Sequence, residues 1–203
     1  MGIRRWCEDL FLFEKPKTRR STTLQSFLTI SWYDRPDLNQ YLQSFSKSPK
    51  PNDELRQKGF RLRVSSGYGK DILSPGPYRD AEYTIALYNN ALTKEVPEKS
   101  DYLACIGFDI DGNRVIVKQI QGNPGKGEIL CLFKWERMLL AILIDWAKQS
   151  SFDQIRVIRA QDQSWYRTDS ERAKRMFMHY DVTARRSGFD FDPNSGEYTK
   201  VLA

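Results

Sequence analysis

Residues 114–160 constrain the fold of this 203-residue chain more than any other segment. Residues 114–120 (RVIVKQI) alternate β-branched and polar side chains, as a strand does, and residues 134–148 carry apolar side chains at helical spacing. Residues 154–160 (QIRVIRA) have the pattern of a second strand. Strand, helix and strand in this order form a βαβ unit. We therefore predict that the two strands are parallel and that the helix packs on one face of their sheet.

A glycine-rich turn, GNPGKG at residues 122–127, connects the first of these strands to the helix. Only a backbone without side chains can approach an anion closely and turn several N–H groups towards it. A helix N-terminus, which has unpaired N–H groups, follows the turn. The turn lacks the spacing of a P-loop. It predicts either a phosphate site formed by Gly122, Gly125, Lys126 and Gly127, or a plain connection between two elements.

The other segments predict an α+β fold with a mixed, mostly antiparallel sheet, a central βαβ parallel pair and flanking helices. Residues 102–110 and 114–120 form a hairpin around Asp111-Gly112, a dipeptide that favours the positive φ angles of tight turns. The residue patterns predict strands at 24–33, 81–89 and 198–202, helices at 34–46 and 169–186, and an edge strand or helix end at 60–64. Glycine and proline content predicts a loop at 65–80.

Length and composition indicate one folded domain. Hydrophobic residues make up 40% of the chain and aromatic residues 13%, which is enough for a core. We expect residues 1–23 to form a basic, aromatic arm and residues 24–203 to form the domain. The net charge of +6 favours an acidic partner, so the arm is a candidate surface for a protein or a nucleic acid. The alternative is a mildly basic protein without such a partner.

Cysteine usage and hydropathy indicate a cytoplasmic protein. Cys7, Cys105 and Cys131 lie far apart without a CxxC pair, so we expect reduced thiols and neither a disulfide framework nor a metal site. No apolar run approaches the roughly 20 residues of a membrane-spanning helix. The apolar patch near the N-terminus is too short for a signal peptide.

The order of elements over roughly residues 80–202 resembles that of the GNAT superfamily of N-acyltransferases. The resemblance is carried by the hairpin, the glycine turn, the long helix, the second strand and a helix that ends at Gly188-Phe189. Residues 180–189 (YDVTARRSGF), with the ending YTKVL, are also similar to bacterial proteins of GNAT-like organisation. In this superfamily the central strand splays from its parallel neighbour, and a Q/R-x-x-G-x-G/A turn binds the pyrophosphate of acetyl-CoA. The resemblance therefore implies acetyl-CoA or another acyl-CoA as cofactor, with Gly125-Lys126-Gly127 as the G-x-G portion.

Three features depart from the superfamily's pattern. Gly122 occupies the Gln/Arg place of the turn, and the stretch 127–155 is several residues longer than the usual helix connection. The usual acid is a tyrosine four residues before the Gly-Phe pair, where this chain has Ala184. Tyr180 precedes Ala184 by about one helical turn and is the candidate acid. In place of an acidic base, the central strand offers Lys118, Gln119 and Gln121.

Two loops supply candidates for contact with a substrate or partner. Asp162, Trp165 and Arg167 follow the strand at 154–160 at its C-terminal end, where open α/β sheets bind ligands. Asp162 is a candidate catalytic residue that orients an amine. Trp165 is a candidate surface on which a ligand stacks, and Arg167 is a candidate contact for a phosphate. The alternative is a solvated surface loop. Tyr68 and Tyr78 lie in the loop at 65–80, whose length is typical of functional loops.

These observations leave two functional hypotheses. One is an acyl-CoA-dependent N-acyltransferase that acts on a small-molecule or peptide amine. The other is a non-catalytic GNAT-like scaffold that binds a protein or a nucleic acid through basic and aromatic surfaces. Besides the arm, the last helix offers basic side chains for such a surface: Arg172, Lys174, Arg175, Arg185 and Arg186.

Overall fold

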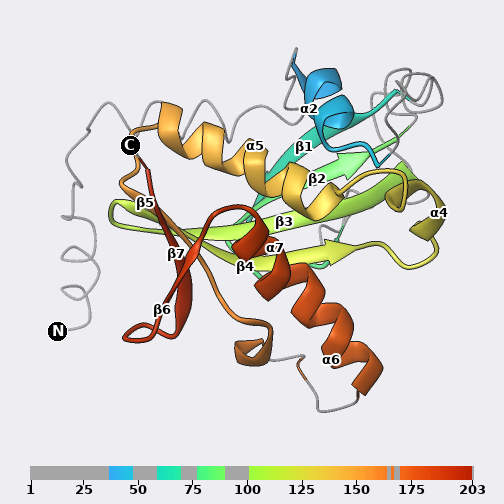
Figure 1. The fold of residues 1–203 in the computed structure, drawn as a ribbon. Helices are drawn as coiled ribbons and strands as arrows, with labels where there is room; N and C mark the ends of the chain where they lie inside the picture. The colour runs from blue at the N-terminus through green and yellow to red at the C-terminus, as the bar shows by residue number, and fades with distance from the viewer. Residues whose placement is uncertain are drawn as a thin grey trace, which may run out of the picture.

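The computed structural model describes residues 37–47, 59–69, 77–89, 101–163, 166 and 170–202. Within these ranges seven strands form one sheet in the order β1-β2-β3-β4-β5-β7-β6 (Figure 1). The strands are β1 (Arg61–Ser66), β2 (Tyr83–Tyr88), β3 (Tyr102–Asp111), β4 (Arg114–Gly122), β5 (Gln154–Val157), β6 (Asp190–Asp192) and β7 (Glu197–Val201). Every neighbouring pair is antiparallel except β4 and β5, which are parallel. This arrangement confirms the predicted mixed sheet and its parallel pair.

Helices occupy most of the segments in which the sequence predicts them. They are α2 (Leu38–Ser44), α4 (Gly127–Leu130), α5 (Trp135–Gln149), the 3₁₀ turn η3 (Ala160–Asp162), α6 (Ser170–Phe177), the π-helical turn η4 (Met178–Val182) and α7 (Thr183–Arg186). The predicted helix at 169–186 is therefore one continuous helix with a π-helical turn in the middle. The predicted arm at 1–23 and strand at 24–33 lie outside the described residues.

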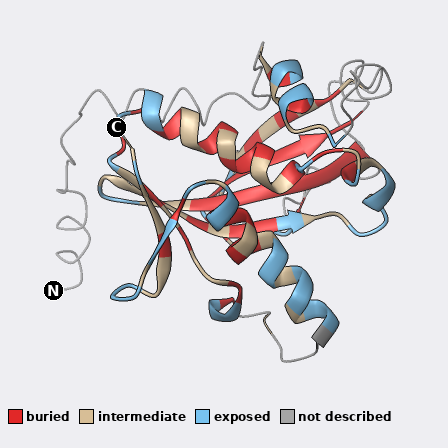
Figure 2. Ribbon diagram, viewed as in Figure 1, coloured by how far each residue is buried: buried red, intermediate tan, exposed pale blue. Residues whose placement is uncertain are grey.

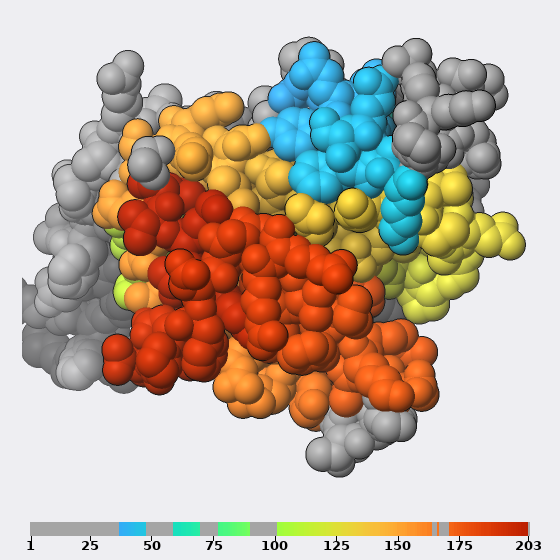
Figure 3. Space-filling view, viewed as in Figure 1, coloured from blue at the N-terminus to red at the C-terminus, as the bar shows by residue number. Residues whose placement is uncertain are grey.

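Helices α2 and α5 pack on one face of the sheet and bury its larger core (Figures 1 and 2). The apolar side chains along one face of α5 pack against this face of the sheet; the ring of Trp146 in α5, for example, lies 5.4 Å from the ring of Phe108 in β3, measured between ring centres. In the same view, α5 and the C-terminal segments conceal most of the strands (Figure 3). None of the helices in the described ranges has the length and apolar character needed to cross a membrane.

The opposite face of the sheet carries a smaller cluster and a close backbone approach. Ala86, Tyr88, Tyr102 and Cys105 form the cluster. A Cβ at Gly107 would lie 2.9 Å from Oε1 of Gln119, so this position needs glycine. The Gln119 side chain also accepts from the N–H of Asp80 and donates to the carbonyl of Tyr78, which fastens residues 77–81 to the sheet. The free thiols in the described ranges are a buried Cys105 and an exposed Cys131.

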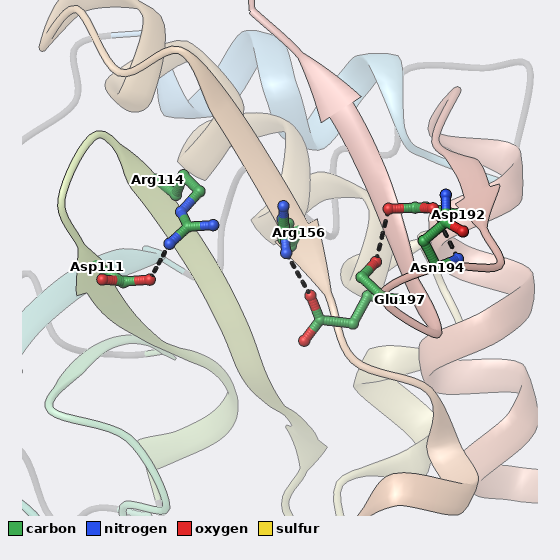
Figure 4. Close-up of polar contacts among 7 residues, drawn as sticks. Asp111, Arg114, Arg156, Asp192, Asn194 and Glu197 are labelled. Atoms are coloured by element: carbon green, nitrogen blue, oxygen red, sulfur yellow. Dashed lines mark hydrogen bonds and ion pairs between the residues drawn. The ribbon is translucent and has the colours of Figure 1, made fainter.

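Polar pairs mark the hairpin turn and the C-terminal side of the sheet (Figure 4). Arg114 and Asp111 form an ion pair across the β3–β4 turn, where Gly112 has a φ of 57°. Arg156 of β5 lies 3.4 Å from the carboxylate of Glu197 in β7. Residues 60–64, for which the sequence left two alternatives, belong to an edge strand: Leu62 and Val64 face the core, while Arg61 and Arg63 are half-buried.

Candidate functional site

The two parallel strands separate after four residue pairs. β4 pairs with β5 from Arg114 opposite Gln154 to Val117 opposite Val157, and the N–H of Ile158 donates to the carbonyl of Val117 at 3.2 Å. β4 continues to Gly122 and stays paired with β3 there. The edge of β4 beyond Val117 therefore faces an opening between the strands, which is the splay that the GNAT resemblance implies. Because β5 diverges from β4 here, β5 ends at Val157, three residues before the end at residue 160 that the sequence predicts.

A β-bulge in β4 lies where the opening begins. Gly107 of β3 is opposite Gln119, while the next residue, Phe108, is opposite Val117, so Lys118 is the extra residue. A bulge of this kind bends a strand and redirects a side chain. The Lys118 ammonium lies 2.5 Å from a carboxylate oxygen of Asp109 on β3.

Tyr180 fills the opening from η4. The N–H of Ile120 donates to its hydroxyl at 3.0 Å, and the hydroxyl lies 3.3 Å from the carbonyl of Lys118, to which it donates. The Gln163 side-chain amide donates to the same carbonyl. Tyr180 is only 5% exposed, and this burial raises the pKa of its hydroxyl, which stays neutral. Two backbone groups on the free edge of β4 are thus paired with side chains of the same chain.

Asp181, the next residue along η4, holds the other side of the opening. Its carboxylate accepts from the N–H of Ala160 at 3.0 Å and from the Tyr198 hydroxyl at 3.2 Å, and the Arg159 guanidinium lies 4.0 Å away. A π-helical turn holds an extra residue, which brings neighbouring side chains closer in direction than an α-helix does. The two consecutive side chains therefore bridge β4 and the chain that leaves β5. We call Tyr180 and Asp181 the η4 wedge.

The predicted phosphate turn has two different parts. Gly125 has a φ of 82°, and Gly127 begins α4, whose first N–H groups have no partner within the helix. Gly122 instead ends β4, and a Cβ there would lie 3.1 Å from Cδ1 of Leu130 and 3.3 Å from Cζ2 of Trp135. Its small size therefore serves packing of α4 and α5 against the strand. The structure keeps Gly125, half-buried Lys126 and Gly127 adjacent in this turn.

The stretch 127–155, which is longer than the usual GNAT connection, places α4 between the glycine turn and α5. Phe133 pairs with Ser46, and the N–H of Lys134 donates to the carbonyl of Phe45 at 2.8 Å. Glu136 in the first turn of α5 lies 2.9 Å from Nδ1 of His179. A carboxylate at this place interacts favourably with the positive end of the helix dipole. The start of the long helix is thus covered by the chain's own residues.

A polar cluster on β3 and β4 involves a predicted contact residue. Asp109 accepts from the N–H of Glu82 at 2.7 Å and from the hydroxyl of Tyr68 at 3.0 Å, besides its ion pair with Lys118. Burial alone would raise the pKa of Asp109, but these donors and the ammonium outweigh it and hold that pKa below its usual range. The ion pair with Asp109 raises the pKa of Lys118. Tyr68 itself is 61% exposed.

Other predicted site residues are dispersed. Asp162 is exposed on η3, and Tyr78 is exposed beside the segment that Gln119 fastens. Trp165 and Arg167 lie outside the described residues. The roles predicted for these four residues stay predictions. Sequence patterns did not identify Asp109, Asp181 or Gln163 as parts of one region, because their partners come from distant segments.

Comparison with known proteins finds remote structural likeness. No protein-family model matches the sequence, and no curated protein matches it. A GNAT-family acetyltransferase from Staphylococcus aureus is 14% identical, with 85% of this chain and 97% of that chain covered and a TM-score of 0.36. A GNAT-family N-acetyltransferase from Escherichia coli, solved in complex with CoA, is 12% identical, with 85% and 79% covered and a TM-score of 0.35. The ribosomal-protein-S18-alanine N-acetyltransferase from Escherichia coli is 12% identical, with 86% and 92% covered and a TM-score of 0.33.

The fold is GNAT-like in its element order. The parallel pair of β4 and β5 and the divergence of these strands are those that the sequence resemblance implies. In the opening, the N–H of Ile120 on the edge of β4 donates to the Tyr180 hydroxyl, and the carbonyl of Lys118 accepts from Tyr180 and Gln163.

Proposed function

We propose that this protein is a non-catalytic GNAT-like scaffold that binds a macromolecular partner. The observation that carries the proposal is the η4 wedge in the opening between β4 and β5. A ligand lying along the edge of β4 has to displace the Tyr180 hydroxyl from Ile120 and Lys118. A buried polar group left without a partner costs about 1–3 kcal/mol, so displacement is opposed by the fold itself.

The chemistry of the described side chains supports the same proposal. The Tyr180 hydroxyl donates to the backbone carbonyl of Lys118, so it has to break that hydrogen bond before it can protonate a leaving thiolate. The Asp109 carboxylate is engaged by a backbone N–H, a hydroxyl and an ammonium. A carboxylate held in this way, with a lowered pKa, is a weak base for an incoming amine.

An acyl-CoA-dependent N-acyltransferase is the second candidate function. The observation in its favour is the turn at Gly125, Lys126 and Gly127, where the first N–H groups of α4 have no partner within that helix. Under this proposal the turn holds the pyrophosphate, Tyr180 is the acid and Asp162 orients the amine. Tyr180 and Gln163 then have to leave the edge of β4 when a cofactor enters.

Calorimetric titration separates the two candidates. We expect no saturable binding of CoA, acetyl-CoA or a long-chain acyl-CoA to the wild-type protein, and no thiol release from acetyl-CoA with a broad panel of amines. A known N-acetyltransferase serves as the positive control for both assays. Saturable binding that raises the melting temperature, together with amine-dependent thiol release, would establish the acyltransferase instead.

The variant Tyr180→Ala sharpens this test, because it removes the side chain that occupies the opening. If the wedge is what excludes a cofactor, Tyr180→Ala gains CoA affinity that Tyr180→Phe, which keeps the ring, does not gain. Tyr78→Phe, a change at an exposed tyrosine, is the matched control and should behave as the wild type. The proposal would be contradicted if the wild type bound CoA and Tyr180→Ala bound it more weakly.

A further inference from the structure

Arginine and aromatic side chains form a continuous series of contacts across the C-terminal elements. The guanidinium of Arg159 lies 5.3 Å from the ring centre of Phe191, and the rings of Phe191 and Tyr198 lie 5.5 Å apart, edge to face. The guanidinium of Arg185 lies 5.6 Å from the ring centres of both Tyr198 and Phe177. We call these five side chains the arginine–aromatic ladder. Each step is a cation–π or aromatic contact of ordinary length.

The ladder runs over segments that are distant in the sequence and adjacent in space. It begins after β5, crosses β6 and β7, and reaches α6 through α7. These elements, orange to red in Figure 3, lie side by side in the lower part of the face shown. Tyr198 in the middle is 2% exposed, while Phe177 and Phe191 towards the two ends are 41% and 45% exposed. The ladder thus has a buried centre and two aromatic side chains open to solvent.

The exposed charged side chains of α6 and α7 are mainly cationic. Four further basic residues on α6 and α7 are exposed: Arg172, Lys174, Arg175 and Arg186. The acidic residues of α6 and η4 are Glu171, which is paired with Lys174 at 3.3 Å, and Asp181, which is buried. Asp190 and Asp192 flank Phe191, but side chains alternate along a strand, so these two carboxylates face away from its ring.

We infer that the arginine–aromatic ladder binds single-stranded nucleic acid, with bases stacked on Phe177 and Phe191 and phosphates paired with the surrounding arginines. Nonspecific recognition of single strands combines a cationic track for phosphates with aromatic faces on which bases stack. Arginine suits this task because its planar fork pairs with phosphate and also stacks on rings. An acidic peptide would use the charges but not the exposed rings. The inference rests on the proposed scaffold function and names its partner.

Fluorescence anisotropy with a labelled single strand of about 12 nucleotides, as RNA and as DNA, tests the inference. We expect Phe177→Ala and Phe191→Ala each to weaken binding at least about fivefold, because an exposed stacking ring is lost. Arg185→Lys keeps the charge but not the stacking, so it should weaken binding while leaving the salt dependence unchanged. Contact with about four phosphates predicts a roughly fiftyfold loss of affinity between 50 and 200 mM salt.

A variant away from the ladder is the control. Lys148→Gln removes one exposed charge at the end of α5. It should bind the oligonucleotide as the wild type does. Circular dichroism and urea unfolding establish that every variant is folded.

Several results would overturn the inference: no binding at low salt, unchanged affinity in folded Phe177→Ala and Phe191→Ala variants, or equal weakening by Lys148→Gln. Competition by polyglutamate as effective as that by unlabelled oligonucleotide would assign the surface to acidic peptides instead. Thiol release from acetyl-CoA by a protein that also shows the expected oligonucleotide binding would remove only the non-catalytic proposal. The two failures are therefore distinguishable.

Discussion

The hydroxyl of Tyr180 accepts a hydrogen bond from the N–H of Ile120 at 3.0 Å, across sixty residues of sequence. Because β5 has already diverged, this N–H has no strand partner on that side. A tyrosine side chain thereby takes the place of a β-ladder bond inside a sheet. The bond makes Tyr180 a structural residue of the opening, whatever else it does.

Tyr180→Phe should lower the free energy of unfolding by about 1–3 kcal/mol, because the buried N–H of Ile120 loses its acceptor. Urea unfolding followed by fluorescence measures the change. The exposed-site variant Tyr78→Phe should differ from the wild type by no more than about 0.5 kcal/mol. Wild-type stability in Tyr180→Phe would show that this hydrogen bond contributes nothing.

The two residues of the η4 wedge should be energetically coupled. Asp181→Asn weakens the contacts with Ala160 and Tyr198, and both single variants loosen the same helical turn. We expect the effects of Tyr180→Phe and Asp181→Asn to be non-additive by about 0.5 kcal/mol or more in a double-mutant cycle. Strict additivity would mean that the two sides of the opening are held independently.

The Asp109–Lys118 pair predicts a pH dependence of stability. The folded-state pKa of Asp109 is lowered, so its contribution is present above the unfolded-state pKa of about 3.9 and is lost as pH falls through the folded value. The pKa of Lys118 is raised, so its contribution is lost only as pH rises through that higher value, above about 10.4.

Asp109→Asn should therefore reduce stability at pH 7 and flatten the loss of stability as pH falls below about 4. Melting temperatures across this range, with the exposed-residue variant Asp162→Asn as control, measure the effect. If Asp109→Asn lost stability at low pH as steeply as the wild type does, the ion pair would be ruled out as the cause of that loss.

Gly107→Ala should destabilise the protein by about 1–3 kcal/mol, because the added Cβ would lie 2.9 Å from Oε1 and 3.0 Å from Cβ of Gln119. The Gln119 side chain is hydrogen-bonded to residues 78 and 80, so it cannot move without breaking those bonds. Gly127→Ala is the matched control: its Cβ would meet no atom within 4 Å, so we expect a neutral or slightly stabilising effect. Equal thermal stability of the two variants would refute the packing argument.

The sequence predicts the βαβ unit well because its signals are local. The alternation at 114–120, the stripe at 134–148 and the Asp111-Gly112 turn each depend on residues that are near one another along the chain. By contrast, the pattern at 154–160 runs on past the end of β5. The strand ends at Val157 because the chain then turns towards Asp181, which accepts the N–H of Ala160.

The contents of the opening could not be predicted in this way. Nothing in the periodicity of residues 169–186 indicates a π-helical turn, and that turn is what directs both Tyr180 and Asp181 inward. The partners of Asp109 come from a loop, the start of a strand and a bulge, and only the folded sheet brings them together. The glycine turn, in contrast, lies where its sequence predicts it, between β4 and α5.

The short parallel pair also divides the sheet into two units, which should open to solvent separately. Four residue pairs join β1–β4 to the β5-β7-β6 ribbon, and the η4 wedge reinforces that seam from the side. Amide protons of β5 and β7 should then exchange with solvent together, through partial openings that leave β3 and β4 protected. Loosening the wedge should speed exchange in the ribbon while exchange in the central hairpin follows global unfolding alone.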